Sequence, residues 1–423
     1  MKTPAQPRIF YGWYIVGGAW LAMFVSAAAI SSFTVFAPEI EAQFGWTRVM
    51  SSWAYTLNTI VISVFGMLAG MLVDRIGLRR MVIVGAIVGG AGTALLSLTG
   101  TLWHFYLLFG FIAPAGISLC FMVPMVATVR RWFMRRAAWA VAIAMTGSGM
   151  GVVILIPLLQ RLIDTIGWQN TYLVLGAMMV AGATIGGSML RKDPESSGTH
   201  PDGVELSLEE LMERSDFAVR NKRWSIGDAF RKPAWWLLML SQFFNMAVIG
   251  IMAHIVFWGS QDLGLPRADV VNYLSYLVLA AVVGRLFGGF FSDWYMARFK
   301  ISRKPILYVG TLSVALGSFL AINVTDATGL LIVSLCIGFG FGIGLAVFPA
   351  YLGDLFGVAN APALLGIMLF ITAGIFGAIG PILFGFVHDA YGSYDLAFLI
   401  TAILCVVSAA ALVFVRQTLV DRE

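Results

Sequence analysis

The sequence predicts an all-α membrane protein with twelve transmembrane helices arranged as two pseudo-symmetric six-helix bundles. Its composition gives the first reason. Of 423 residues, 59% are hydrophobic and 12% are charged, whereas about 25% of residues in soluble domains are charged. The second reason is the number of apolar stretches, because twelve of them are long enough to span a bilayer core, which takes about 20 residues. The third is a short motif, a glycine and an aspartate followed by basic residues, that occurs once in each half of the chain.

The expected helices follow one another with short connections, except for one long gap. When the N-terminus is placed in the cytoplasm, Arg48, Arg161 and Arg267 are the basic residues of the outer loops, and most of the others fall on the inner side. Such an imbalance sets membrane orientation, so we expect a multi-pass cell-membrane protein with both termini in the cytoplasm. The first stretch is too long for the core of a signal peptide and is expected to remain as a span. The helices are expected at residues 12–36, 50–73, 81–99, 103–127, 138–160, 170–190, 234–259, 271–295, 305–323, 328–351, 362–387 and 394–415.

The long gap between the sixth and seventh stretches is expected to be a cytoplasmic linker. It starts with the polar run RKDPESSGTHPDG, which is typical of an exposed connection. Two stretches, 206–219 and 226–236, have patterns that predict short helices at the membrane surface. The chain is therefore expected to divide into an N-terminal bundle (1–190), the linker (191–233) and a C-terminal bundle (234–423).

The two halves contain similar segments at matching places. GMLVDRIGLRR follows the second stretch, and GFFSDWYMARFKISRK follows the eighth. In each, a glycine (Gly70 or Gly289) is followed after three residues by an aspartate (Asp74 or Asp293) and then by basic residues. Internal repeats of this kind are typical of secondary transporters, whose substrate site lies between the repeats.

Arg285 lies inside an otherwise apolar span. The positions one turn away are Ala281, Val282, Gly288 and Gly289, so its own helix offers no acidic partner. A charge near the bilayer centre costs at least about 2.5–3.5 kcal/mol on insertion scales, and it needs a partner or a function. A guanidinium matches a carboxylate through two parallel hydrogen bonds, which predicts a small carboxylate anion as ligand. The alternative is a structural arginine that is paired with another helix or with backbone carbonyls.

Other classes of function find no support in the sequence. Cys120, Cys336 and Cys405 lie in predicted spans and form no metal-ligand cluster, and no nucleotide-binding loop or hydrolase motif is present. We therefore expect no enzyme activity, no cofactor and no metal. The net charge of +5 reflects membrane topology rather than nucleic-acid binding. The expected partners are a carboxylate, protons and the bilayer, and the protein is expected to be a monomer.

Four segments resemble known families. GMLVDRIGLRR resembles the loop signature of the major facilitator superfamily. RIFYGWYIV, RWFMRRAAWAVAIAMTGSGMG and GAIGPILFGFVHDAYGSYDLAF resemble segments of its monocarboxylate transporters and their bacterial oxalate/formate-type relatives. This resemblance implies that Arg285 occupies the place of the arginine that binds the substrate carboxylate. It also implies that Asp74, Arg75 and Arg79 belong to a cytoplasmic gate, in which Asp293 is the counterpart from the second repeat.

The sequence departs from this branch at three positions. Ala281 and Ser31 stand where many animal members have an aspartate and a lysine, so proton coupling cannot be assigned to that pair. Met122 stands where bacterial relatives often have a tyrosine, which predicts a more apolar wall and a bulkier or less polar acid.

The remaining site predictions depend on helix position. His254 is a candidate proton carrier or second substrate contact, and a structural, hydrogen-bonded histidine is the alternative. The residues expected to line the cavity, each of which could instead be ordinary packing, are Ser31, Asn58, Phe121, Met122, Met145, Gly149 and Phe341.

These observations favour a secondary carrier of small monocarboxylates, such as lactate or pyruvate, that works by alternating access. Arg285 neutralises one carboxylate, which favours a monocarboxylate over a dianion such as oxalate. Proton symport is favoured because a lone anion would have to enter against an inside-negative potential. A carboxylate anion exchanger and a non-transporting carboxylate sensor remain as alternatives.

Overall fold

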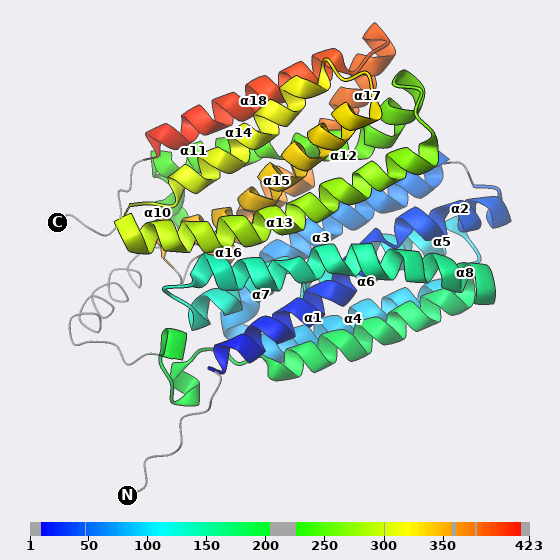
Figure 1. Cartoon of the computed structure of the whole chain (residues 1–423). Coiled ribbons are helices and arrows are strands. Elements are labelled where there is room, and N and C mark those ends of the chain that lie inside the picture. The colour runs from blue at the N-terminus through cyan, green and yellow to red at the C-terminus, as the bar shows by residue number, and fades with distance from the viewer. Residues whose placement is uncertain are drawn as a thin grey trace, which may run out of the picture.

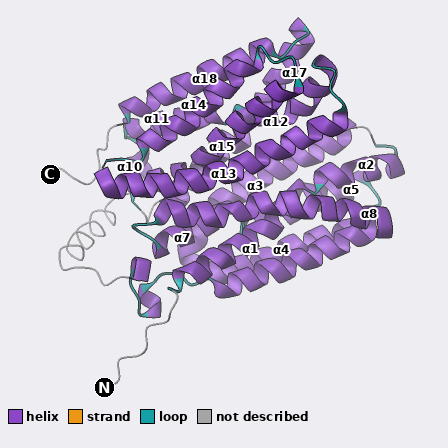
Figure 2. Ribbon diagram, in the orientation of Figure 1, coloured by secondary structure: helices purple, strands orange, loops and turns teal. Residues whose placement is uncertain are grey.

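The computed structural model describes residues 10–46, 48–203, 226–299, 301–357, 361–376 and 379–415. The regular secondary structure of these ranges is all helical, and loops and turns connect the helices (Figure 2). The first half contains α1 (Gly12–Ser31), α2 (Phe33–Phe44), α3 (Arg48–Ile76), α4 (Leu78–Leu95), α5 (Leu102–Phe105), η2 (Tyr106–Ile112), α6 (Ala113–Ser118), α7 (Met122–Trp132) and α8 (Ala137–Met189). The second half contains α11 (Pro233–Asn245), α12 (Val248–Phe257), η5 (Trp258–Asp262), α13 (Arg267–Phe299), α14 (Lys304–Ala321), α15 (Ala327–Phe356), α16 (Ala361–Leu369), η6 (Phe370–Phe376), α17 (Ile379–Tyr391) and α18 (Asp395–Phe414).

Eleven helical segments of the described chain are long and apolar enough to cross a membrane. One of them, α8, has 53 residues and contains Gly167 at φ 79° and ψ 161°, a conformation that only glycine adopts readily. Gly167 therefore separates a fifth span from a sixth. The twelve transmembrane helices predicted from the sequence are confirmed.

The first span of each half is interrupted near its middle. α1 ends at Ser31 and α2 begins at Phe33, while α11 ends at Asn245 and α12 begins at Val248. Ser32, Met246 and Ala247, which lie at these breaks, keep right-handed helical backbone angles. Each first span therefore continues through its break.

The helices of the two halves lie side by side and meet along two seams (Figure 1). In one seam α13 packs along α8, and in the other α16 packs along α3. The repeated glycines lie at these seams, because a Cβ atom at Gly70 would collide with the carbonyl oxygen of Pro362, and one at Gly289 would lie 2.7 Å from that of Ala138. The sequence repeat therefore marks two places where the halves approach each other closely.

Backbone contact also occurs within the first half. A Cβ atom at Gly147 would collide with the carbonyl oxygen of Trp20, and one at Gly151 with that of Phe24. Small residues allow such close helix packing in a membrane. α1 and the first part of α8 consequently form one rigid pair.

α1 begins and α18 ends at the same end of the bundle, called here the terminal end (Figure 1). The start of the linker is bound there, since one carboxylate oxygen of Asp202 accepts hydrogen bonds from the backbone N–H groups of Met134 (2.9 Å) and Arg135 (2.8 Å). The predicted helix at 226–236 is present as α10 (Ile226–Phe230), followed by α11. The one predicted at 206–219 lies outside the described residues.

Candidate substrate site and gate

Arg285 lies in the seam between α13 and α8 and is 8% exposed. Its NH1 atom donates to the carbonyl oxygen of Met145 (2.7 Å) and to Oγ of Ser148 (3.0 Å), both on α8. No ion pair joins it to a carboxylate within the described residues, and its Nε is buried without a hydrogen-bond partner. The partners of Arg285 are therefore neutral groups of the opposite half.

The backbone of α8 is shaped to admit this guanidinium. A Cβ atom at Gly149 would lie 3.5 Å from NH1 of Arg285 and 2.7 Å from a methyl group of Val282. A larger side chain at position 149 would collide with Val282 and crowd the guanidinium of Arg285. An anion that replaced the neutral partners of Arg285 would gain a charge-assisted hydrogen bond in a site with little water.

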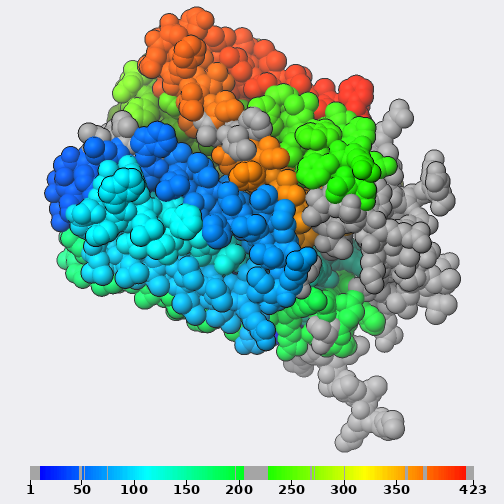
Figure 3. All heavy atoms as spheres, turned by 180° about the vertical axis from the view of Figure 1, so that it is seen from behind, coloured from blue at the N-terminus to red at the C-terminus, as the bar shows by residue number. Residues whose placement is uncertain are grey.

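The second seam contains a cavity of about 150 Å³ between α3, α7 and the α16–η6 segment. Figure 3 shows the face of the molecule on which α3, in blue, meets α16, in orange. The lining is mostly apolar, with hydroxyl groups from two serines. It consists of Ile62, Ser63, Gly66, Ser118, Phe121, Met122, Val123, Gly366, Leu369 and Ala373.

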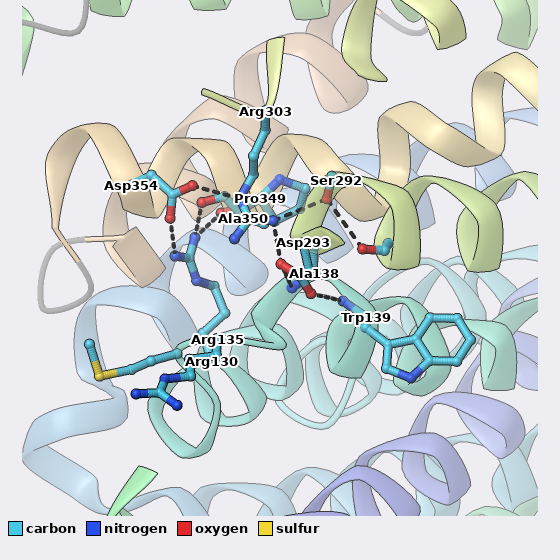
Figure 4. A network of polar contacts seen from close by, with 12 residues as sticks. Arg130, Arg135, Ala138, Trp139, Ser292, Asp293, Arg303, Pro349, Ala350 and Asp354 are labelled. Atoms are coloured by element: carbon cyan, nitrogen blue, oxygen red, sulfur yellow. Dashed lines mark hydrogen bonds and ion pairs between the residues drawn. The ribbon is translucent and has the colours of Figure 1, made fainter. Parts of the chain in front are cut away.

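Charged residues from both halves form a network near the terminal end (Figure 4). Arg130 of α7 forms an ion pair with Asp354 of α15 (3.0 Å) and donates to the carbonyl oxygens of Pro349 (2.6 Å) and Ala350. The other oxygen of Asp354 binds Nε of Arg303 (2.6 Å). The cluster of Arg130, Asp293, Arg303 and Asp354 is called here the gate network.

Asp293 joins the gate network to the first turn of α8. Its carboxylate pairs with Arg303 and accepts hydrogen bonds from the backbone N–H groups of Ala138 (3.2 Å) and Trp139 (2.7 Å). An acidic group at a helix N-terminus also interacts favourably with the helix dipole. Burial lowers the pKa of Arg303, but the charges of Asp354 and Asp293 outweigh burial and raise that pKa above its ordinary value. Arg303 is therefore charged, and the ion pairs and hydrogen bonds of the network join the halves at this end.

Comparison with known proteins identifies the fold family. A family model described as "Major Facilitator Superfamily" matches residues 19–302 and 295–422. The chain belongs to this superfamily. The fold agrees, since the E. coli fucose:proton symporter aligns with a TM-score of 0.69 at 19% identity, covering 96% of this chain and 100% of that one. A second structure of that symporter, described as in the outward conformation, also gives a TM-score of 0.69, at 18% identity over 95% of this chain and 99% of that one.

Curated relatives within the superfamily are monocarboxylate transporters. Monocarboxylate transporter 12 of Rattus norvegicus is 23% identical over 98% of this chain and 87% of its own length. Monocarboxylate transporter 2 of Homo sapiens is 25% identical over 91% of this chain and 81% of its own length. These relatives confirm the predicted resemblance, and they are transporters rather than enzymes.

The predicted cavity residues of this superfamily member fall into three groups. Phe121 and Met122 line the cavity of the second seam. Met145 and Gly149 lie against Arg285. The lining of that cavity does not include Ser31, Asn58 or Phe341.

All three of these residues have other contacts. Asn58 donates to the carbonyl oxygen of Phe109 (2.7 Å) within the first half, and Phe341 packs against the core of the second half. Ser31 is half-buried at the end of α1, and its carbonyl oxygen accepts from Thr34 (2.9 Å). A substrate contact by any of the three remains a prediction.

His254 has a hydrogen bond at each ring nitrogen. Nδ1 lies 3.0 Å from the hydroxyl of Tyr394, and Nε2 lies 3.0 Å from the carbonyl oxygen of Pro381. Both contacts agree with the alternative prediction, in which His254 is a structural, hydrogen-bonded histidine. They do not exclude a protonation change, and the predicted roles of His254 in substrate binding and proton coupling remain predictions.

The gating roles predicted for four residues stay predictions. Asp293 lies in the gate network, where it pairs with Arg303. Arg75 and Arg79 are exposed, and the side chain of Asp74 lies outside the described residues, so their gating roles stay predictions. Sequence reasoning missed Arg130, Arg303 and Asp354. Each stands near a helix end, where a charge is ordinary, and their pairing depends on α7, α14 and α15 meeting in space.

Proposed function

We propose that this superfamily member carries small monocarboxylates across the membrane by alternating access, with Arg285 as the carboxylate ligand. The observation that carries the proposal is the burial of Arg285 between the halves without a carboxylate partner among the described residues. Its present partners are a backbone carbonyl and a hydroxyl, which a substrate carboxylate can replace. A ligand bound there touches both halves and responds to their relative movement.

The cavity of the second seam, whose lining does not include Arg285, is proposed to receive the small apolar body of the acid as the substrate passes between the halves. Its volume, about 150 Å³, is comparable to that of an engineered apolar cavity that accepts benzene. Phe121 and Met122 supply apolar wall, and Ser63 and Ser118 can bind a hydroxyl or keto oxygen. We infer a lactate- or pyruvate-like acid, with bulkier apolar monocarboxylates also admitted.

Charge and orientation complete the proposal. Because the basic residues favour cytoplasmic termini, the terminal end faces the cytoplasm, and the gate network closes the cytoplasmic side. The structure then corresponds to an outward-facing state. Proton symport is proposed because moving one negative charge against 100 mV costs about 2.3 kcal/mol.

The deciding experiment is uptake of mono- and dicarboxylates into proteoliposomes by Arg285→Ala, Arg285→Lys and the control Arg298→Ala. Arg298 lies on the same helix and is exposed. Loss of the buried guanidinium is expected to cost about 3 kcal/mol, an affinity loss of about 100-fold. Lysine keeps the charge but lacks the planar pair of donors, so its rescue should be partial. Near-normal uptake by Arg285→Ala in correctly inserted protein would contradict the proposal.

The same vesicles separate the alternative functions. An imposed pH gradient without internal substrate drives uptake by a symporter and leaves an obligate exchanger silent. A sensor would bind carboxylate without any flux.

A further inference from the structure

A group of titratable side chains lies within the second half, away from Arg285. Its inner member is His254 on α12. The carbonyl oxygen of Pro381 can only accept, so Nε2 of His254 carries the proton in that 3.0 Å contact. In the neutral ring, Nδ1 is then the acceptor for the hydroxyl of Tyr394. The lone pair of Nδ1 therefore points toward a proton donor.

The outer members surround Tyr394. The ring of His388 on α17 stacks on the ring of Tyr394, with 4.5 Å between centroids. Nε2 of His388 lies 3.5 Å from a carboxylate oxygen of Asp262, and Nδ1 lies 4.0 Å from one of Asp389. Asp389 is 89% exposed, while His388 and Asp262 are partly exposed. The group therefore runs from the exposed carboxylate of Asp389 to the half-buried imidazole of His254.

The surrounding described charges are mainly acidic. η5 contributes Asp262, α17 contributes Asp389, α18 contributes Asp395, and α13, which also packs on α12 and η5, contributes Asp269 together with the phenol of Tyr273. The side chain of Arg267 at the start of α13 lies outside the described residues. The negative charges of these carboxylates attract cations to the outer end of the group, beside the ring of His388.

Tyr394 lies between α17 and α18, at the end of the molecule opposite the terminal end. Burial raises the pKa of its hydroxyl, and the charges of Asp262 and Asp389 raise it further. The phenol therefore remains protonated at physiological pH and available as a donor. It is 4% exposed, which shields its hydrogen bond to His254 from competing water.

We propose that Asp262, His388, Tyr394 and His254, called here the proton cluster, form a proton-entry pathway that is separate from the carboxylate ligand Arg285. The proposal rests on the proposed carboxylate transport, because it assigns the route of the co-transported proton. Chains of His and acidic residues within spans are a known means of proton conduction.

The proton moves in two steps. His388 takes a proton from solvent beside Asp262 and Asp389. Rotation of its ring then passes that proton to the hydroxyl oxygen of Tyr394, while the hydroxyl gives its own proton to Nδ1 of His254. Tyr394 ends unchanged, and one positive charge arrives on His254. The proton on His254 and the carboxylate at Arg285 add one positive and one negative charge to the empty carrier, so their joint transport moves no net charge.

The test compares two activities of the same proteoliposomes with labelled lactate and the panel of acids. One is net uptake driven by a pH gradient, and the other is exchange of internal for external acid at equal pH. Tyr394→Phe, His388→Gln and Asp262→Asn should reduce gradient-driven uptake by at least about tenfold while exchange stays within about twofold of the unmodified protein. Tyr394→Phe keeps the ring and removes only the hydroxyl.

Two control variants lie at the surface. Tyr391→Phe changes a phenol that is 68% exposed three residues from Tyr394, and His104→Gln changes an exposed histidine of the first half. Both should leave the two activities unchanged. Proton entry through the proton cluster is refuted if Tyr394→Phe and His388→Gln retain gradient-driven uptake. It is also refuted if the unmodified protein exchanges acids but does not respond to the pH gradient. Absence of both activities in the unmodified protein would instead refute carboxylate transport.

Discussion

Arg285 and Arg130 are both buried arginines between the halves, but their charges are compensated differently. Arg130 has the carboxylate of Asp354, whereas Arg285 has neutral partners among the described residues. The sequence could predict that Arg285 is special, because a charge inside an apolar span is costly wherever the helix packs. It could not predict the role of Arg130, because the Arg130–Asp354 pair joins residues 224 positions apart.

Asp354→Asn is expected to open the terminal end. The substitution removes the negative charge shared by Arg130 and Arg303, and a hydrogen bond to a charged group contributes about 1.5–3 kcal/mol. The closed state should therefore lose at least about tenfold in population. The measurement uses Ala127→Cys as reporter, since Ala127 lines a cavity of about 10 Å³ behind Arg130. A thiol reagent added from the terminal side should label it faster in the Asp354→Asn background.

The matched control for this charge removal is Asp164→Asn, which changes an exposed aspartate on α8. It should leave labelling of the reporter unchanged. Equal labelling rates in the two backgrounds would show that Asp354 does not hold the gate. A double-mutant cycle with Arg130→Ala separates the direct pair from the contribution of Arg303.

At the scale of helices, Gly70→Ala should weaken the closed state, while Gly66→Ala one turn earlier should not. A Cβ atom at Gly70 would collide with the carbonyl oxygen of Pro362 on α16, but one at Gly66 meets only a methyl group of Val123 at 3.9 Å. Both substitutions gain the same helix propensity, about 1 kcal/mol. Any difference between the two variants therefore comes from the contact between α3 and α16. Overpacking costs about 1–3 kcal/mol.

The Ala127→Cys reporter measures this effect too. Labelling from the terminal side should accelerate by about fivefold or more in Gly70→Ala. Gly289→Ala, on the matching helix of the second half, should act in the same direction because Ala138 approaches it closely. Identical rates for Gly70→Ala and Gly66→Ala would exclude a gating role for this seam.

The existence of the helices could be predicted because apolar length alone decides whether a segment spans a membrane. The interruptions after Ser31 and Asn245 were not predicted, because neither site carries a proline or glycine that would mark it. They depend on packing against other helices. The close pairing of α1 with α8 follows from Gly147 and Gly151, whose small size the sequence shows but whose partners it does not.

At the scale of the whole molecule, the internal repeat predicted two similar halves and a site between them. It could not predict that α8 faces α13 while α3 faces α16, since both seams depend on how the halves dock. It also could not predict which end is closed. The gate network lies at the terminal end, where its four charged residues join α7 and α15 and connect the start of α8 to α13 and α14 (Figure 4).

A closed terminal end predicts one-sided access to the interior. In right-side-out vesicles, an impermeant thiol reagent added outside should label Ser63→Cys, in the cavity of the second seam, and should leave Ala127→Cys unlabelled. The native cysteines provide a low background, since Cys120 and Cys405 are buried and Cys336 is half-buried. Introducing Asp354→Asn should slow external labelling of Ser63→Cys, because weakening one gate favours the state that opens to the other side. If both cysteines react equally from outside, and Asp354→Asn changes neither, the two halves do not alternate as proposed.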